Sequence, residues 1–242
     1  VTEISHKIFL FNTFKMTQIY TILFDLDGTI VNTAPDLMAA HNHVMKKYGH
    51  ETKTTDDIRK LVGKGAASLI GRSVWGQAKK EFGKITDEKI KKEMVTEFID
   101  YYGKNIFVES KLFKGVHNFL QWCKENNISM GVCTNKQDYL ATDLLKKIKI
   151  NHFFEYVAGS NTFDYCKPDP RHLTSVIEIL DGDIKKSLMI GDSETDANAA
   201  KNAGIPVILL EDGYTEKNTT EIYHNHLIKD FVGIEKIVSK YL

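Results

Sequence analysis

Short apolar runs alternate with longer amphipathic segments along much of the chain. Five runs have the length and composition of buried strands: residues 20–24 (YTILF), 128–135 (ISMGVCTN), 156–160 (YVAGS), 187–192 (SLMIGD) and 206–211 (PVILLE). The segments that follow the last four, and the segment before the second, space their apolar residues three or four apart, as helices do. Strands that alternate with helices predict βαβ units and a parallel sheet covered on both faces.

The stretch between residues 35 and 107 has a different pattern, because its apolar positions recur at helical spacing and no strand is predicted in it. The first strand therefore precedes a helical block and must rejoin the sheet formed by the later strands. We expect an α/β fold, with a Rossmann-like parallel sheet core and an inserted all-helical cap domain. The core would comprise residues 16–34 and 108–242, the cap residues 35–107, and residues 1–15 an N-terminal extension.

Composition narrows the class of partner. Lysine plus arginine and aspartate plus glutamate both number 32, so no charge excess favours nucleic acid or an anionic membrane. Cys123, Cys133 and Cys166 are far apart and form no metal-type spacing, which is typical of a reducing compartment. The apolar patch at residues 8–11 is too short to span a bilayer. We expect a cytoplasmic monomer or homodimer acting on a small molecule.

Polar side chains follow four of the predicted strands. Asp25 and Asp27 follow the first, and the others are Thr134 with Asn135, Lys167, and Asp192 with Asp196. In an open parallel sheet, ligands bind beyond the carboxyl ends of the strands, so these groups should meet at one edge. Taken singly, each has an ordinary structural interpretation as a turn residue, a helix cap or a solvated cation.

Four carboxylates at one edge need a cation, because each close pair repels by roughly 4 kcal/mol at an effective dielectric constant near 20. Oxygen ligands alone indicate a hard divalent ion. Mg²⁺ is favoured, since it binds through one or two carboxylates together with waters and substrate phosphate. The sequence therefore predicts a magnesium site that includes Asp25, Asp27, Asp192 and Asp196.

The motifs DLDGT, VCTN, CKPDP and GDSETD, in this order and each after a strand, resemble the haloacid dehalogenase-like hydrolase superfamily. That resemblance implies that Asp25 attacks phosphorus and forms an aspartyl-phosphate, and that Asp27 is the general acid and base. It also implies metal ligation by Asp25, the Asp27 backbone carbonyl and Asp192. Asp196 would join the metal site by orienting Lys167 or a metal-bound water.

The same resemblance assigns the remaining core motif residues. Thr134 and the Asn135 amide would bind phosphoryl oxygens, and Lys167 would neutralise the charge on Asp25 and on the transferred group. Gly28 would leave room for a close backbone approach. An aspartate at position 27 is typical of the phosphatase and phosphomutase branches, and Thr29 favours phosphatases.

Longer stretches, such as DLDGTIVNTAPDL and MIGDSETDANAAKNAG, resemble the phosphoglycolate phosphatase family, with Lys64 standing where that family usually has asparagine. The resemblance implies a phosphomonoester substrate, 2-phosphoglycolate. A carboxylate on the substrate would need a cation from the cap, and Lys64 and Arg72 are the candidates. A β-phosphoglucomutase-like isomerase, a pyrophosphatase or nucleotidase with the same core, and a non-catalytic binder of phosphorylated ligands remain alternatives.

Overall fold

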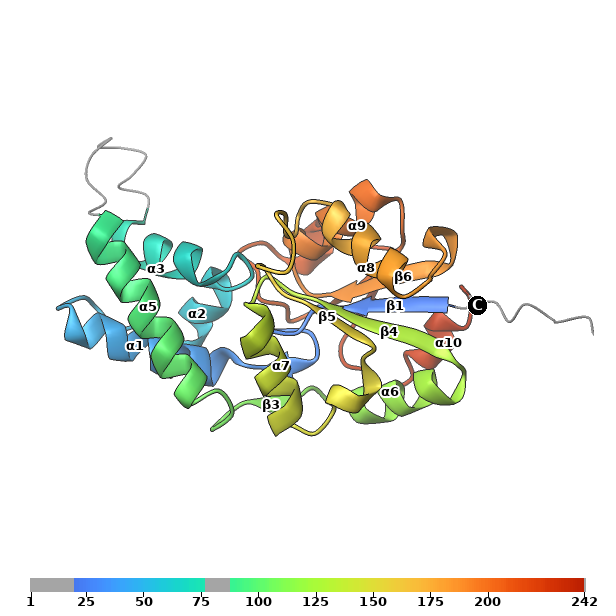
Figure 1. Ribbon diagram of the computed structural model, residues 1–242, viewed down its shortest axis with the longest axis horizontal. Helices are drawn as coiled ribbons and strands as arrows, with labels where there is room; N and C mark the ends of the chain where they lie inside the picture. Colours follow the sequence, from blue (N-terminus) through green and yellow to red (C-terminus); the bar gives the residue numbers. More distant parts are fainter. Residues whose placement is uncertain (1–19, 77–87, 242) are drawn as a thin grey trace, which may run out of the picture.

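The structure is a computed structural model that describes residues 20–76 and 88–241. Its centre is a six-stranded sheet in the order β5-β4-β1-β6-β7-β8, in which all neighbouring strands are parallel (Figure 1). The strands are β1 (Tyr20–Phe24), β4 (Ile128–Cys133), β5 (Tyr156–Ala158), β6 (Ser187–Gly191), β7 (Val207–Leu210) and β8 (His226–Ile228). The predicted α/β class with a parallel sheet is confirmed.

The strand order determines where the polar strand ends meet. The chain runs from β1 outward to β4 and β5, then crosses back to place β6 on the other side of β1. A crevice forms where the strand order reverses in this way, and ligands of doubly wound sheets bind there. The residues that follow β1 and β6, the two strands beside this crevice, include Asp25 and Asp192.

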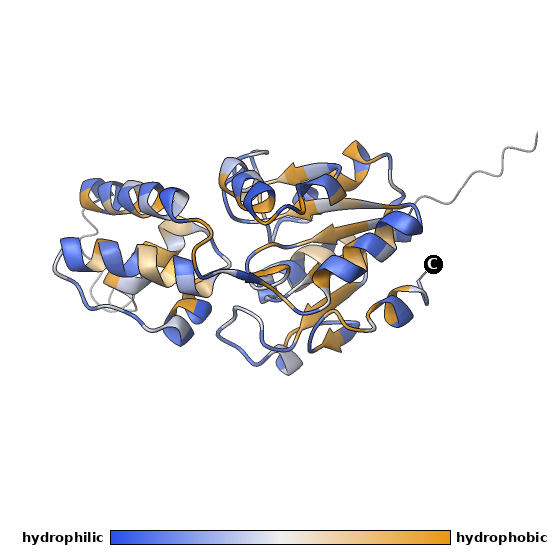
Figure 2. Ribbon diagram, turned by 90° about the horizontal axis from the view of Figure 1, so that it is seen from below, coloured by the Kyte–Doolittle hydropathy of each residue, from blue (hydrophilic) through white to orange (hydrophobic). Residues whose placement is uncertain are grey.

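Helices cover both faces of the sheet, as expected for a parallel sheet. They are α6 (Val116–Glu125), α7 (Asp138–Lys147), α8 (Arg171–Ile179), α9 (Glu194–Ala203) and α10 (Glu235–Val238), with 3₁₀ turns at Asn151–Phe153, Ile184–Lys186 and Thr219–Glu221. Phe24 packs in the apolar cluster of α6 and α7, whereas Leu23 packs in the cluster of α8 and α9, because successive strand residues face opposite sides. Figure 2 shows the apolar strands enclosed between these helices.

A separate group of helices lies beyond the carboxyl ends of the strands, and we call it the cap (Figure 1). Its helices are α1 (Ala34–Lys47), α2 (Thr55–Leu61), α3 (Ala66–Trp75) and α5 (Glu88–Lys104). Pro35 lies in the first turn of α1, and a capping box between Thr54 and Asp57 begins α2. Among the described residues of 35–107 no strand occurs, in agreement with the predicted helical insertion.

The two chain segments that connect the core to the cap are bonded to each other. A short antiparallel pair joins β2 (Val31–Asn32) to β3 (Lys111–Leu112). Asp36, buried in the first turn of α1, accepts hydrogen bonds from the backbone amides of Val108, Glu109 and Ser110, at 2.9 to 3.0 Å, and from the Ser110 hydroxyl. The segment that leaves the core is therefore bonded to the segment that returns to it.

The structure also differs from the sequence prediction in several elements. Strand β8 was not predicted, because three residues between polar neighbours carry too little alternation to be recognised. The final helix spans only Glu235–Val238, shorter than the predicted 233–242. The predicted N-terminal extension, residues 1–15, and residues 77–87 of the predicted helical cap lie outside the described residues. No helix in the described ranges is both long and apolar enough to cross a bilayer.

Candidate active site

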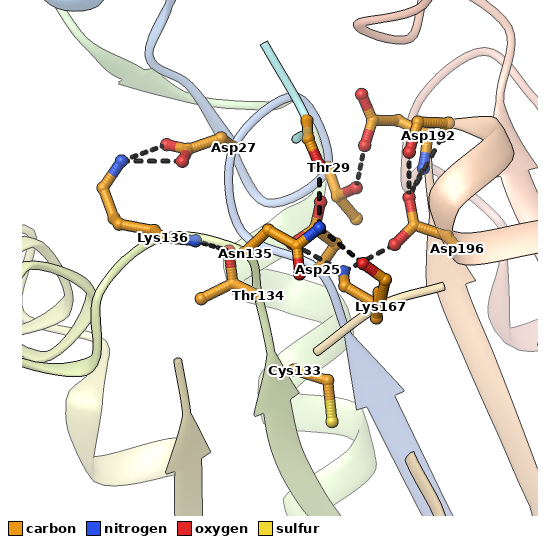
Figure 3. Close-up of polar contacts among 12 residues, drawn as sticks. Asp25, Asp27, Thr29, Cys133, Thr134, Asn135, Lys136, Lys167, Asp192 and Asp196 are labelled. Atoms are coloured by element: carbon orange, nitrogen blue, oxygen red, sulfur yellow. Dashed lines mark hydrogen bonds and ion pairs between the residues drawn. The ribbon is translucent and has the colours of Figure 1, made fainter. Parts of the chain in front are cut away.

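Three buried carboxylates meet at the carboxyl edge of the sheet. Asp25 follows β1, Asp192 follows β6, and Asp196 lies in the first turn of α9. One ligand oxygen from each lies within 4.8 Å of the others. Figure 3 shows how the three side chains are arranged. Their exposed fractions are 6%, 1% and 0%, respectively, so bulk water screens them little.

The turn after β1 brings the backbone against Asp192. Gly28 has a φ of +85°, and a β-carbon there would lie 2.2 Å from the Asp192 Oδ2 atom. The next residue, Thr29, donates its hydroxyl to Asp192 Oδ1 at 3.0 Å, and the Tyr214 amide donates to Oδ2 at 2.6 Å. The turn therefore both requires a glycine and fixes the orientation of the Asp192 carboxylate.

Lys167 is the cation of the cluster. Its Nζ atom lies 3.0 Å from Asp25 Oδ1 and 2.6 Å from Asp196 Oδ1. Burial alone would lower the pKa of Lys167, but the carboxylates of Asp196 and Asp25 raise it above its usual value. The ammonium group is therefore charged beside the Asp25 carboxylate throughout the neutral range.

Asp196 is saturated with hydrogen bonds. Its Oδ1 accepts from Lys167, and its Oδ2 accepts from the Asp192 amide, the Ser193 amide and the Ser193 hydroxyl, at 2.8 to 3.1 Å. This arrangement is the capping box that begins α9. The bonding favours Asp196 as a residue that positions Lys167 and Asp192 over Asp196 as a direct metal ligand.

The electrostatics of the cluster suit a divalent cation. The pKa of Asp25 is raised to about 6, because burial together with the charges of Asp196 and Asp27 outweighs the opposing charge of Lys167. Burial and the charges of Asp196 and Asp25 raise the pKa of Asp192 well above its usual value. A bound cation would offset the desolvation and the repulsion of these oxygen donors, and Mg²⁺ prefers oxygen donors. The residues present therefore fit this ion.

Asp27 lies apart from the carboxylate cluster. Figure 3 shows it turned toward Lys136, whose ammonium group lies 2.8 and 2.6 Å from its two oxygens. The Thr33 hydroxyl donates to Oδ1 at 2.7 Å. Lys136 was not among the residues predicted from the sequence, although its position directly after the strand-end pair of Thr134 and Asn135 was an available signal.

Thr134 and Asn135 lie between Asp27 and Lys167, as predicted for residues at the end of β4. The Thr134 hydroxyl accepts from the Lys136 amide at 3.3 Å. The Asn135 side-chain amide donates to the carbonyls of Lys167 and Gly63, at 2.9 and 3.0 Å, so that it joins the core to the cap. Asn135 Oδ1 is buried without a hydrogen-bond partner.

A cavity of about 300 Å³ opens above these groups. Its floor is formed by residues of the core, among them Asp25 and Cys166. The cap supplies an apolar wall that includes Leu69, Val95, Phe98 and Ile99. Lys64 lines the cavity between Gly63 and Gly65, as the sequence analysis anticipated. Cys123 and Cys133 are buried away from its lining, whereas Cys166 is half-buried and lies on it.

The structure does not bring Arg72 into this cavity. Its guanidinium group donates to the carbonyls of Lys60 and Leu61 at the end of α2, and it is paired with Glu216 of the core. These partners engage the Arg72 guanidinium group, which was expected to bind the carboxylate of the substrate. Lys64 is thus the one of the two expected cap cations that reaches the cavity.

Comparison with known proteins agrees with this geometry. Residues 22–210 match the family model of the haloacid dehalogenase-like hydrolases. A phosphoglycolate phosphatase of Caulobacter vibrioides is 38% identical over 216 residues, which are 89% of each chain. One of Agrobacterium fabrum is 35% identical over 90% of this chain and 94% of its own.

A crystal structure from Haemophilus somnus, described as a predicted phosphoglycolate phosphatase, superposes with a TM-score of 0.83. It is 31% identical, and the match covers 92% of this chain and 99% of that one. The chain therefore belongs to the haloacid dehalogenase-like hydrolase family. With relatives of this kind over nearly its full described length, it is a phosphatase of that family.

Proposed function

We propose that the protein is a Mg²⁺-dependent phosphomonoester hydrolase that acts on 2-phosphoglycolate through an aspartyl-phosphate. The observation that carries this proposal is the contact of Asp25, on the floor of a cavity that the cap covers, with the charged Lys167 beside Asp192. The names of the relatives supply the substrate. The magnesium ion and the covalent intermediate are our inference from the cluster and from the family.

We assign the roles of the residues from their positions and from the resemblance to the family. Asp25 attacks phosphorus, and Lys167 balances the negative charge that gathers on the phosphoryl oxygens. The Thr134 hydroxyl and the Asn135 backbone amide, at the cavity floor, donate to those oxygens. The ion, held by Asp25, the Asp27 carbonyl and Asp192, would supply further charge neutralisation. Asp27 protonates the leaving alkoxide and then takes a proton from the attacking water.

A phosphatase panel under Mg²⁺ tests the proposal. We expect release of inorganic phosphate from 2-phosphoglycolate at a higher kcat/KM than from pyrophosphate or nucleoside monophosphates, and no activity in EDTA until Mg²⁺ is restored. Ca²⁺ should inhibit, because its higher coordination number can make the Asp25 carboxylate bidentate and spoil its line of attack. Full activity in EDTA would remove the metal from the proposal.

The isomerase alternative makes a different prediction for the same panel. A β-phosphoglucomutase-like enzyme must be primed with a sugar bisphosphate, so the bisphosphate would stimulate interconversion of glucose phosphates. A hydrolase should instead release phosphate without such stimulation. The monomeric or homodimeric state and the cytoplasmic location stay predictions.

A further inference from the structure

Lys136 is buried at the wall of the cavity, with 5% of its side chain exposed. A lysine is rarely buried to this degree unless its charge is paired. Here its partner is Asp27, and both carboxylate oxygens of Asp27 accept hydrogen bonds from the Lys136 ammonium group. Thr33 holds the same carboxylate from the other side. Asp27 is therefore fixed by two donors in the arrangement that the structure shows.

This arrangement does not suit the role proposed for Asp27. A general acid must lie within hydrogen-bond reach of the leaving oxygen, which stands next to the phosphorus that Asp25 attacks. Figure 3 shows Asp27 turned to Lys136, on the opposite side of Asp25 from Asp192 and Asp196. Both of its oxygens are engaged there by a cation. Lys136 must therefore move away from Asp27 before Asp27 can protonate the leaving group.

Tyr102 of α5 supplies a second group at the same place. Its ring lies under the Lys136 ammonium, with Nζ 4.5 Å from the ring centroid, and it also lines the cavity. Its hydroxyl is buried and has no hydrogen-bond partner. A buried hydroxyl without a partner is destabilising, so a ligand that accepts from it would be favoured. The Lys136 ammonium and the Tyr102 hydroxyl, from two residues that both line the cavity, are donors that suit a carboxylate.

We propose that Lys136 and Tyr102 form the subsite for the carboxylate of the leaving group, and that binding of this carboxylate transfers Lys136 from Asp27 to the substrate. The inference rests on the proposed function, because 2-phosphoglycolate carries such a carboxylate. Lys136 keeps one carboxylate partner in this exchange, because the substrate carboxylate replaces Asp27. Asp27 is released only when a substrate with the correct anion is present. Recognition of the leaving group is thereby coupled to the supply of the acid.

Lys64 is the competing candidate for this subsite. It also lines the cavity, but it is exposed, and exposed ion pairs contribute little because water screens them. Lys136 is buried, so an exchange of its partner occurs where electrostatic interactions are stronger. The two lysines can be distinguished by the same substitution at each position, with Lys146→Met, on the exposed surface of α7, as the matched control.

The experiment compares two substrates with similarly poor leaving groups, of which one carries a carboxylate. These are 2-phosphoglycolate and ethyl phosphate. In Lys136→Met we expect kcat/KM for 2-phosphoglycolate to fall about 10- to 100-fold, while that for ethyl phosphate is unchanged or rises because Asp27 is no longer held. Tyr102→Phe should raise KM for 2-phosphoglycolate about 2- to 10-fold and leave ethyl phosphate unaffected. Lys64→Met and Lys146→Met should preserve the preference between the two substrates.

Binding of two phosphonates supplies a readout that does not depend on turnover. The wild-type protein with Mg²⁺ should bind phosphonoacetate more tightly than ethylphosphonate in calorimetry, and Lys136→Met should abolish the difference. If that difference exists but 2-phosphoglycolate is not hydrolysed, the proposed function is wrong and the subsite stands. The subsite is overturned if Lys136→Met and Tyr102→Phe, both folded by circular dichroism, lower activity equally on both substrates or leave the phosphonate preference intact.

Discussion

Gly28 and Asp192, which are 164 positions apart, lie so close that a β-carbon on the glycine would stand 2.2 Å from the Asp192 Oδ2 atom. The contact joins the turn after β1 to the end of β6, the two strands beside the crevice. The Thr29 hydroxyl and the Tyr214 amide donate hydrogen bonds to the same carboxylate, so Asp192 cannot move away from an added β-carbon without losing them. The position thus requires a glycine on two grounds, its contact distance and its positive φ.

We therefore expect Gly28→Ala to abolish activity and to destabilise the fold. Gly204→Ala is the matched control, because Gly204 has a similar φ of +74° and nothing within 4 Å of the added carbon. The control should cost only the left-handed backbone strain of about 1–2 kcal/mol and remain active. Activity assays and urea unfolding of both variants measure the difference. Equal effects at the two positions would mean that the approach to Asp192 has no consequence.

Asp25→Asn should remove turnover without loss of the fold. The amide cannot attack phosphorus, and its neutral side chain relieves the burial and repulsion that raise the pKa of Asp25 to about 6. Lys167 keeps Asp196 as its partner at 2.6 Å. In EDTA, the melting temperature should therefore be no lower than that of the wild type. Asp143→Asn, outside the cavity lining, should be active, and near wild-type turnover in Asp25→Asn would contradict the nucleophile assignment.

Asp27→Asn should slow hydrolysis of 2-phosphoglycolate by about 10²–10⁴-fold, since general acid–base assistance has this magnitude. The loss should be smaller for p-nitrophenyl phosphate at the first step, because p-nitrophenolate leaves without a proton. Rapid acid quenching with labelled substrate should then find phosphate retained on the protein, because hydrolysis of the aspartyl-phosphate lacks its general base. Absence of a labelled intermediate together with a uniform loss on both substrates would argue against this role.

The acid limit of stability should depend on His172. Its Nδ1 accepts from the Lys167 amide at 3.3 Å, its Nε2 has no partner, and burial lowers its pKa to about 4. The unfolded chain has an ordinary histidine pKa of about 6.5, so between these values the unfolded state binds a proton that the folded state does not. His172 should thus make the free energy of unfolding fall by about 3 kcal/mol as the pH drops from about 6.5 to about 4.

His172→Asn tests that slope, because its Oδ1 can accept the same hydrogen bond but does not titrate. The variant should be less stable near pH 7, where it leaves a cavity, and its deficit should shrink as the pH falls. Urea unfolding across this pH range measures the two curves. Parallel curves would assign the acid sensitivity to other groups.

The strand-end residues could be predicted from sequence because their placement is dictated by topology. A polar residue after an apolar run reaches the carboxyl edge of a parallel sheet, so Asp25, Thr134, Lys167 and Asp192 were selected correctly for position. The long helices were predicted for a similar reason, since the 3.6-residue period repeats over several turns.

The residues that sequence reasoning misplaced depend on contacts between separate elements. Arg72 has a helical position that suits the cavity, but its partner Glu216 lies in a distant core loop that no local pattern reveals. Lys136 directly follows the polar end of β4, but only the fold shows that its ammonium group meets Asp27 and the ring of Tyr102. Strand β8 is recognisable only through its pairing with β7.

The hydrogen bonds of Asp36 limit the ways in which the cap can move. Two connections that were not bonded to each other would let the cap twist and slide as well as tilt, since each connection could rotate about its own backbone bonds. Asp36, at the start of α1 in one connection, accepts hydrogen bonds from three consecutive backbone amides of the other connection. The β2–β3 pair adds a second fastening a few residues away. Twisting or sliding of the cap would break these paired bonds, so they favour a hinge-like tilt about the two connections, and the Asn135–Gly63 hydrogen bond and the Arg72–Glu216 ion pair oppose that tilt.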